Sequence, residues 1–360
     1  MQSFKITCII HSLGIGGMER VMAVLLRHFG REEDLKVDLI LIGKKREVAF
    51  ALPDSIRIHR PAFKFEAYGR SRATLKTMYF LRKKVRDIKP DTVLSFGEMW
   101  NNLVLLSLAG LPYPVFISDR SQPNKHLGRF HNFLRDRLYP GAKGYIAQTQ
   151  QAARIARDQK WNRNIKVIGN PVRNIKKSAF QQREKIVVSV GRLIATKHFD
   201  ALIRMFVEID EPGWQLIILG GNAKNKDLLS ELNQLVKTLG AESKVHLAGE
   251  VKNVEAYLNR ASVFAFASSS EGFPNAIAEA LSAGLPVVAY DCVAGPSDLI
   301  EDGENGFLVK THDQHDFKAK LQTLMRDNGL REKFSKRTGL KLHPLTADRI
   351  AADFLTFITS

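Results

Sequence analysis

Two glutamates at the junction between a strand and a helix are well suited to bind a ligand. Glu271 lies in a loop after a buried apolar run, and Glu279 follows eight positions later inside a helix. Pro274 suits the first position of that helix, where no amide donor is needed. We expect the amides around Phe273 and Asn275 to face the ligand. The two carboxylates can then accept hydrogen bonds from hydroxyl groups in different parts of it.

Two cations near another strand end suit a diphosphate group. Gly191 follows the strand expected at 185–190, and Arg192 and Lys197 come next in the same loop. The forked guanidinium of Arg192 can bind two phosphate oxygens at once, whereas Lys197 supplies a point charge. A loop held together by salt bridges would show the same residues, so the cations alone leave both interpretations open.

A glycine-rich turn follows the first expected strand and opens the first helix. Gly14, Gly16 and Gly17 let the backbone approach a ligand, and free amides at a helix N-terminus attract anions. A nicotinamide-dependent oxidoreductase has a similar turn, but the final glycine of its fingerprint is missing here. The second strand is followed by 43–46, Gly-Lys-Lys-Arg, with no acidic residue to hold a ribose.

Two series of alternating strands and helices must position these residues. In the first series, apolar β-branched runs at 5–11 and 36–42 flank a segment at 17–29 with helical periodicity. The second series begins after the proline turn at 169–172. Such alternation is typical of parallel sheets covered by helices on both faces. We therefore expect an α/β protein with two Rossmann-like domains, whose ligands bind beyond the carboxyl ends of the strands.

The composition is that of an ordinary globular chain. It has 360 residues, of which 44% are hydrophobic and 25% are charged, and this length suggests two domains. Cys8 and Cys292 are too few for a disulfide framework or a four-thiolate zinc site. The apolar runs are shorter than the ~20 residues that span a bilayer. The first residues are typical of a strand and not of an export signal, so we expect a cytosolic protein.

The positive charge is concentrated in one half of the chain. Residues 1–170 hold 30 Lys and Arg against 14 Asp and Glu, whereas residues 171–360 hold 24 against 23. Such a one-sided field attracts nucleic acid, anionic lipid or a phosphorylated substrate. A nucleic-acid-binding protein would explain this charge but not the glutamate pair.

One expected helix, at 70–89, interleaves basic with apolar and aromatic residues. Its cations include Arg72, Lys76, Arg82, Lys83 and Arg86. A second basic and aromatic stretch lies at 129–143. The pattern favours a surface that lies on an anionic membrane, although a core-facing stripe with a solvated outer face would look similar.

Taken in order, these motifs resemble those of the family-4 retaining glycosyltransferases, whose GT-B fold has two Rossmann-like domains facing across a cleft. The resemblance covers nearly the whole chain: the glycines at 16–17, Asn170-Pro171, Gly191-Arg192 with Lys197, Glu271 with Glu279, and 302–309. It implies a metal-independent enzyme without a cofactor. Such an enzyme moves a sugar (GalNAc, GlcNAc or a hexose) from a UDP-sugar, so we expect no nucleic acid partner.

The resemblance also implies roles for the candidate residues. Gly16 and Gly17 would line the donor phosphates, and Arg192 with Lys197 would neutralise the leaving diphosphate. By the same resemblance Glu271 would hold hydroxyls of the transferred sugar. Two further residues complete the implied donor site, with Glu279 at the ribose and the backbone around Glu250 at the base.

The sequence departs from the family after the strand that ends at Ser118, where many relatives carry a histidine. Here Asp119 and Arg120 follow. We expect Arg120 to contact a phosphate of the donor or the acceptor, and Asp119 to orient it. No Asp-x-Asp metal motif occurs, and the histidines and aspartates at 312–316 are more typical of a solvated turn than of a metal site.

The expected domains follow from this resemblance. Residues 1–170 would form an acceptor- and membrane-facing domain, and 171–340 a nucleotide-sugar-binding domain. A C-terminal helix at 341–360 would cross back to the first. The helix at 70–89 resembles the basic helix of the GalNAc-adding transferase of bacterial protein N-glycosylation, which holds a lipid diphosphate. We therefore expect a lipid-linked saccharide acceptor in cell-surface glycan synthesis, used at the inner face of the cell membrane. A soluble or lipid A-core acceptor is the alternative.

Overall fold

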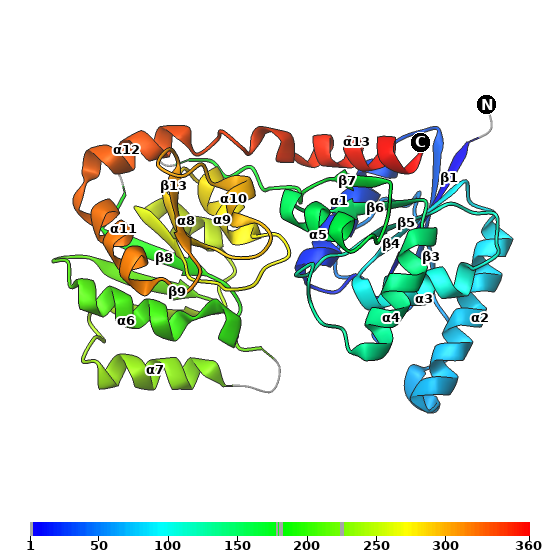
Figure 1. Ribbon diagram of the computed structural model, residues 1–360, viewed down its shortest axis with the longest axis horizontal. Coiled ribbons are helices and arrows are strands. Elements are labelled where there is room, and N and C mark those ends of the chain that lie inside the picture. Colours follow the sequence, from blue (N-terminus) through cyan, green and yellow to red (C-terminus); the bar gives the residue numbers. More distant parts are fainter. Residues whose placement is uncertain (1–2, 178, 180–182, 224–226) are drawn as a thin grey trace. The chain divides into compact units, whose positions relative to one another are not determined.

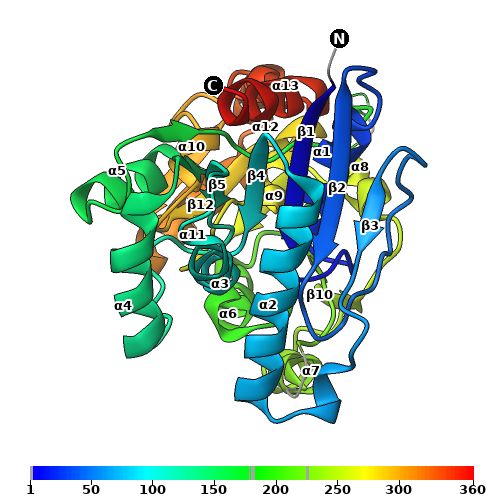
Figure 2. The ribbon, with the colours of Figure 1, turned by 90° about the vertical axis from the view of Figure 1, so that its right-hand side faces the viewer.

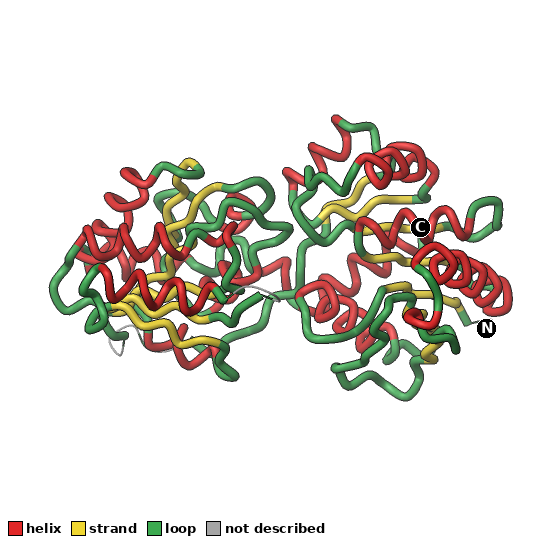
Figure 3. The backbone as a smooth tube through the Cα atoms, turned by 90° about the horizontal axis from the view of Figure 1, so that it is seen from below, coloured by secondary structure: helices red, strands yellow, loops and turns green. Residues whose placement is uncertain are grey.

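The computed structural model describes residues 3–177, 179, 183–223 and 227–360. The chain divides into two compact units. Unit 1 comprises Met1–Pro171 and Ala347–Ser360, and unit 2 comprises Val172–Thr346. Figure 3 shows the strands of each unit in yellow among red helices. The α/β fold with two Rossmann-like domains, predicted from the alternation of strands and helices, is confirmed.

Unit 1 is built on a parallel sheet with the strand order β3-β2-β1-β4-β5-β6-β7. The strands are β1 (Phe4–Ile10), β2 (Leu35–Leu41), β3 (Arg57–His59), β4 (Thr92–Phe96), β5 (Val115–Ser118), β6 (Gly144–Ala147) and β7 (Ile165–Val167). Every residue of β4 and β5 is buried, as expected for strands covered on both faces.

The helices of unit 1 cover both faces of this sheet. They are α1 (Gly17–Phe29), α2 (Arg70–Ile88), α3 (Glu98–Leu108), α4 (Arg129–Leu138), α5 (Gln150–Asp158) and α13 (Ala347–Ile358). In Figure 2, α2 is the long helix at the outside of this unit, and it packs against α3, which in turn packs against α4. The sequence analysis predicted this helix at 70–89, and the observed bounds of α2 confirm it.

Unit 2 repeats the arrangement with the strand order β10-β9-β8-β11-β12-β13. The strands are β8 (Ile186–Val190), β9 (Gln215–Leu219), β10 (Val245–Gly249), β11 (Val263–Phe266), β12 (Val287–Asp291) and β13 (Gly306–Lys310). The helices are α6 (Phe199–Ile209), α7 (Leu228–Thr238), α8 (Val254–Arg260), α9 (Asn275–Ser282), α10 (Pro296–Leu299), α11 (Gln314–Arg326) and α12 (Asn328–Arg337). Separate apolar clusters fill the two faces of the sheet.

The C-terminal helix α13 belongs to unit 1, far from its neighbours in sequence. It packs beside α1, as Figure 1 shows in red and blue. The Phe354 ring lies 5.9 Å from the Phe96 ring, and the Phe357 ring lies 5.3 Å from the Phe116 ring. Gly144 permits the second contact, because a Cβ there would come within 2.8 Å of both of these rings. The last helix therefore closes the core of the first unit.

Within the described ranges, every helix is too short or too polar to cross a bilayer.

Candidate functional site

The candidate residues of unit 2 gather at the carboxyl edge of its sheet. The loops after β8, β9 and β10 lie side by side there. The Gly191 amide donates to the Leu219 carbonyl at 2.9 Å, and the Gly220 amide donates to the Gly249 carbonyl at 2.8 Å. In the next step along the chain, the Leu193 amide donates to the Gly221 carbonyl at 3.0 Å. These bonds bring the residues after three strands into one small region.

Glycine at position 220 is required for this close approach. A Cβ on Gly220 would lie 1.8 Å from the Gly191 carbonyl oxygen, and its φ of 157° is rare for other residues. Gly221 lies beside Glu250, which is exposed after β10, because a Cβ there would be 3.3 Å from the Glu250 side chain. The sequence argument overlooked this second glycine pair, whose signal was a Gly-Gly directly after a strand.

Lys197 and Glu271 form an ion pair between the loops that follow β8 and β11. The Lys197 Nζ lies 2.5 Å from the Glu271 Oε1, and each side chain is only 14% exposed. The Lys197 Nζ also lies 4.9 Å from the centre of the Phe266 ring, and its methylene chain passes close to Gly191. The structure thus brings together two residues that lie 74 positions apart in the sequence.

Arg192 differs from Lys197 in this respect. Its side chain is exposed, and among the described residues it has no hydrogen-bond or ion-pair partner. The sequence left two interpretations open, a diphosphate site and a loop held together by salt bridges, and each cation fits a different one. Lys197 is held in a salt bridge, whereas Arg192 is available to an anionic ligand.

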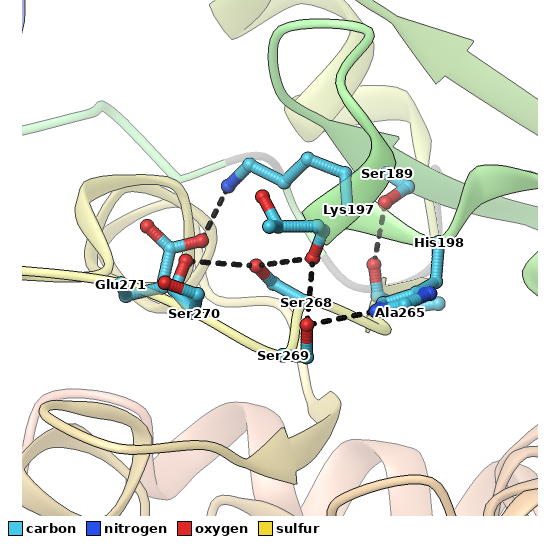
Figure 4. A network of polar contacts seen from close by, with 9 residues as sticks. Ser189, Lys197, His198, Ala265, Ser268, Ser269, Ser270 and Glu271 are labelled. Carbon is cyan, nitrogen blue, oxygen red and sulfur yellow. Dashed lines mark hydrogen bonds and ion pairs between the residues drawn. The ribbon is translucent and has the colours of Figure 1, made fainter. Parts of the chain in front are cut away.

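Serine side chains and one histidine hold the Glu271 loop against the Lys197 loop. The Thr196 carbonyl accepts hydrogen bonds from the Ser269 amide at 2.9 Å and from the Ser268 hydroxyl at 3.1 Å. The His198 Nε2 lies 2.8 Å from the Ser269 Oγ. Figure 4 shows this network beside the Lys197–Glu271 ion pair. Unit 2 therefore fixes both charged side chains through their own backbone segments.

The start of α9 differs from the sequence expectation. Pro274 is the N-cap and not the first helical residue, and a Cβ on Gly295 would lie 2.3 Å from its ring. The Asn275 amide already donates to the Phe273 carbonyl at 2.9 Å, so the expectation that it faces a ligand is wrong. Phe273 itself is buried in the core. Glu279 is half-buried in the second turn of the helix.

In unit 1, the glycine turn at the start of α1 carries a carboxylate. Gly16 is the N-cap, and a Cβ there would lie 2.2 Å from the Glu19 Oε2. Glu19 also pairs with the His11 Nε2 at 3.3 Å. Burial lowers the pKa of His11, although Glu19 opposes this shift. A phosphate at Gly16 and Gly17 would therefore have to displace the Glu19 side chain, which the sequence argument overlooked although acidic residues are common in first helical turns.

Arg120 is held inside unit 1 by polar and aromatic partners. Its guanidinium donates to the Asn170 Oδ1 at 2.6 Å and to the Ser118 Oγ at 3.2 Å, and it lies 4.7 Å from the Phe96 ring centre. Burial lowers the pKa of Arg120 to about 9, with Glu98 opposing, so the side chain stays charged at neutral pH. Asn170, from the Asn-Pro turn, is thus directly tied to this arginine.

Asp119 does not orient Arg120, contrary to expectation. Its carboxylate accepts hydrogen bonds from the Tyr139 hydroxyl at 2.7 Å and from the Asn101 side chain at 2.9 Å. Burial is the main cause that raises the pKa of Asp119 to about 7, and Glu98 adds to the effect. The prediction failed because the Asp119 carboxylate is bound by Tyr139 and Asn101, whereas the Arg120 guanidinium is bound by Asn170 and Ser118.

The basic helix α2 has a narrow buried stripe and a broad exposed face. Its buried residues are Ala73, Thr77, Leu81 and Val85. The exposed residues include Arg72, Leu75, Lys76, Tyr79, Lys83 and Arg86. Lys76 lies 4.1 Å from the Tyr68 ring centre. Most of the cations assigned to an acceptor or membrane surface therefore share one face.

Arg82 differs from the other α2 cations. Its Nη1 donates to the carbonyls of Ser107 and Ala109, at 3.0 and 2.8 Å, where α3 ends. These carbonyls lack partners within their own helix, so Arg82 caps α3. Its assignment to an acceptor or membrane surface has to take account of this structural contact.

Among the described residues, no three His, Cys, Asp or Glu side chains are grouped as a metal site would require. The stretch 312–316 instead starts α11, where the Asp313 side chain accepts a hydrogen bond from the Asp316 amide at 3.0 Å.

Comparisons with known proteins agree with this two-unit arrangement. Residues 15–173 match the model for Glycosyltransferase Family 4, and residues 172–340 match the model for Glycosyl transferases group 1. The chain is 28% identical to an N-acetylgalactosaminyltransferase of Campylobacter jejuni, with 98% of this chain and 99% of the relative aligned. The full name of that relative is N-acetylgalactosamine-N,N'-diacetylbacillosaminyl-diphospho-undecaprenol 4-alpha-N-acetylgalactosaminyltransferase.

Two solved structures show the same fold. The lipopolysaccharide outer core galactosyltransferase WaaB has a TM-score of 0.80 at 19% identity, with 99% of each chain covered. Anabaena HepE, in complex with UDP and glucose, has a TM-score of 0.78 at 18% identity, with 98% of each chain covered. The GT-B fold expected from the sequence is therefore confirmed.

Proposed function

The chain belongs to the glycosyltransferases that join a family 4 domain to a group 1 domain, and we propose that it transfers a sugar from a UDP-sugar to a lipid-linked saccharide. The proposal rests above all on the Lys197–Glu271 ion pair beside the free guanidinium of Arg192. These groups lie together at the carboxyl edge of the sheet of unit 2. There they offer hydrogen-bond acceptors for sugar hydroxyls and positive charge for a diphosphate.

The ion pair gives the donor site a specific electrostatic property. Without a ligand, Lys197 balances the charge of Glu271 and leaves Arg192 as the open cation. When a donor binds, the Glu271 carboxylate can accept hydrogen bonds from sugar hydroxyls. Lys197 can then interact with the diphosphate as well as with Glu271. We infer that Glu271 and Lys197 act on the sugar and the leaving group respectively, and that Glu279 and the backbone at Glu250 hold the nucleoside.

The proposed reaction retains the configuration at the anomeric carbon. The bond between C1 and the diphosphate oxygen breaks, and its electron pair leaves with UDP. The acceptor hydroxyl oxygen bonds to C1 on the same face, and its proton passes to the leaving diphosphate. Arg192 and Lys197 stabilise the developing negative charge, a role that a bound metal ion fills in other enzymes. We therefore propose a transfer that needs neither metal nor cofactor.

A UDP donor is supported by the solved complex of HepE, which contains UDP and glucose. In unit 1, we propose that Gly16 and Gly17 approach the donor phosphates once Glu19 has moved aside. Arg120 keeps its positive charge at the same sheet edge and would face a phosphate of the donor or the acceptor.

A lipid-linked acceptor is supported by the Campylobacter relative, whose name places its acceptor sugars on diphospho-undecaprenol. The exposed face of α2 carries Arg72, Lys76, Lys83 and Arg86 together with Leu75 and Tyr79. On α4, Phe130 is 67% exposed and Phe133 is 59% exposed. Cations beside exposed aromatic and aliphatic side chains suit the interface of an anionic membrane. We propose peripheral binding to the inner face of the cell membrane through these helices.

A panel of UDP-sugars, scored for nucleotide release with and without a lipid-diphosphate saccharide, tests the proposal. We expect one donor to give acceptor-dependent UDP release that persists in EDTA. Product anomers, read by NMR, should match the donor. Release from no UDP-sugar would reject the donor class, and inversion at C1 would reject the mechanism.

The alternative acceptor is distinguished by the same assay. A saccharide without the lipid diphosphate, or a lipid A-core saccharide, should support less transfer. Equal turnover with the soluble saccharide, together with failure to sediment with anionic vesicles at low salt, would favour the alternative.

A further inference from the structure

We propose that His198 is a positioning residue, which with Ser269 sets the distance between the backbone segments that carry Lys197 and Glu271. The proposal rests on the function proposed for that ion pair. It concerns the uncharged contact between His198 and Ser269, which lies beside the ion pair. Neither His198 nor Ser269 needs to touch the substrate.

The first observation is the place of the two residues in their loops. His198 directly follows Lys197, and Ser269 lies two residues before Glu271. The His198 Nε2 is 2.8 Å from the Ser269 Oγ, and the Ser269 amide donates to the Thr196 carbonyl at 2.9 Å. The two loops are therefore joined on both sides of Lys197, as Figure 4 shows.

The second observation is the backbone of His198. Its φ of 49° and ψ of 42° lie in the left-handed region, which glycine adopts freely and other residues adopt in only a few per cent of cases, histidine more often than most. Glycine would fit this position with less strain but would provide no side chain. Left-handed residues of this kind cluster at functional sites, where the surrounding structure holds them.

The third observation is that the histidine ring is itself held. The His312 ring lies 5.2 Å away in an edge-on contact, and His312 also has a positive φ, of 71°. On the other side, the His198 carbonyl accepts a hydrogen bond from the Leu202 amide at 3.0 Å, in the first turn of α6. The neighbouring Phe199 is buried in the core. The ring is thus held by His312, and the His198 backbone by the first turn of α6, while the ring reaches Ser269.

These contacts matter most when the donor is bound. In the free protein, the Lys197–Glu271 ion pair and the His198–Ser269 contact together hold the two loops at this spacing. A bound UDP-sugar competes for both charges and weakens the ion pair. The His198–Ser269 contact uses no charged atom and persists, so it then sets the loop spacing. Loss of the contact should therefore reduce the rate of turnover more than it reduces the affinity for the donor.

Four variants test this inference. His198→Gly keeps the backbone conformation and removes the ring, whereas Ser269→Ala removes the hydroxyl. His198→Asn keeps a side chain that tolerates the left-handed region and can reach a hydroxyl. Ser189→Ala is the matched control, because Ser189 donates to the Ala265 carbonyl at 2.7 Å in the same sheet without joining the two loops.

We expect kcat to fall about 10-fold in His198→Gly and in Ser269→Ala, the effect of a small misplacement of a reacting group. The KM for the UDP-sugar should change less than about 2-fold, because ground-state contacts remain. His198→Asn should recover most of the lost kcat, and Ser189→Ala should keep it. An unchanged kcat in His198→Gly, or an equal loss in Ser189→Ala, would overturn the proposal.

A second measurement does not depend on activity. The coupling free energy between Lys197 and Glu271 is obtained from urea unfolding of Lys197→Met, Glu271→Gln and the double variant. We expect this coupling to shrink when the cycle is repeated in the His198→Gly background. Unchanged coupling would refute the positioning role, even if no UDP-sugar is turned over. Reduced coupling without turnover would keep the positioning role and reject the proposed function alone.

Discussion

At the scale of the residue, the ion pair of Lys197 and Glu271 determines how the site of unit 2 responds to change. Both side chains are largely buried and therefore poorly solvated, and each neutralises the charge of the other. Removal of one partner leaves the other as a poorly solvated charge, whereas removal of both does not. Stability and activity should therefore separate when the two residues are replaced singly and together.

The first prediction uses this separation. Lys197→Met and Glu271→Gln should each lower kcat/KM by about 100-fold or more, because each removes a group that acts on the transferred sugar or the leaving group. The double variant should regain stability relative to Lys197→Met but not activity. Thermal unfolding and donor-release kinetics measure the two effects. Recovered turnover in the double variant would show that the pair is structural only.

The second prediction concerns Asp119, whose pKa is raised by burial to about 7. Its carboxyl keeps a proton in the folded state that the unfolded chain loses above pH ~4. The resulting stabilisation is complete below that pH and is lost as the pH rises to about 7. Asp119→Asn should remove this dependence. We compare the free energy of unfolding of the wild type and the variant between pH 5 and pH 8. That of the wild type should fall more steeply with rising pH than that of the variant, by up to about 1.4 kcal/mol per pH unit. Parallel curves would contradict the assignment.

At the scale of the element, the two kinds of cation on α2 should behave differently. Arg72, Lys83 and Arg86 are exposed, whereas Arg82 caps α3. Replacing the three exposed residues with Gln should weaken sedimentation with anionic vesicles by roughly 100-fold, at about 1 kcal/mol per charge. Unfolding temperature should hardly change. Arg82→Gln is the control, which should lower the unfolding temperature and affect vesicle binding less. Equal loss of binding in both would contradict the assignment of two roles.

The fourth prediction concerns the loops that carry the site of unit 2. Gly220→Ala should destabilise this unit by about 2 kcal/mol or more, because the added Cβ would meet the Gly191 carbonyl. Gly240→Ala is the matched control. Its φ is also positive, at 61°, but a Cβ there meets no atom within 4 Å, so we expect a loss near 1 kcal/mol. Urea unfolding compares the two. A similar loss of stability in the two variants would show that the positive φ, and not the contact with the Gly191 carbonyl, accounts for the cost of an alanine at position 220.

How far the sequence predicted these elements depended on the range of the interactions. Strands such as β4 and helices such as α1 follow from local periodicity, and their order gave the fold class. The contact between Lys197 and Glu271 was not predicted, because the two residues lie 74 positions apart. The expectations for Asp119 and Asn275 were wrong, and the contact of Arg82 with the end of α3 was overlooked, because these partners come from other elements or from a local turn. Composition and spacing carry little information on such contacts.

At the scale of the whole molecule, α13 links the end of the chain to the core of unit 1. Phe354 is fully buried against α1 and the Phe96 ring. Phe354→Ala should cost about 3 kcal/mol or more, and the loss should fall on unit 1. Hydrogen exchange resolved by peptide would show faster exchange in β1 and β4, with little change in β8 and β9. Uniform acceleration over both units would indicate that the chain unfolds as a single body.

The same helix bears on how the protein is made. A ribosome delivers Met1–Pro171 first, then all of unit 2, and only after unit 2 the segment Ala347–Ser360 that completes unit 1. Until then the surface that receives α13, including Phe96 and Phe116, has no cover. Unit 1 therefore cannot complete its fold before α13 has been synthesised. We expect the nascent chain to expose this apolar surface while unit 2 is being synthesised, when chaperones that bind such surfaces can reach it.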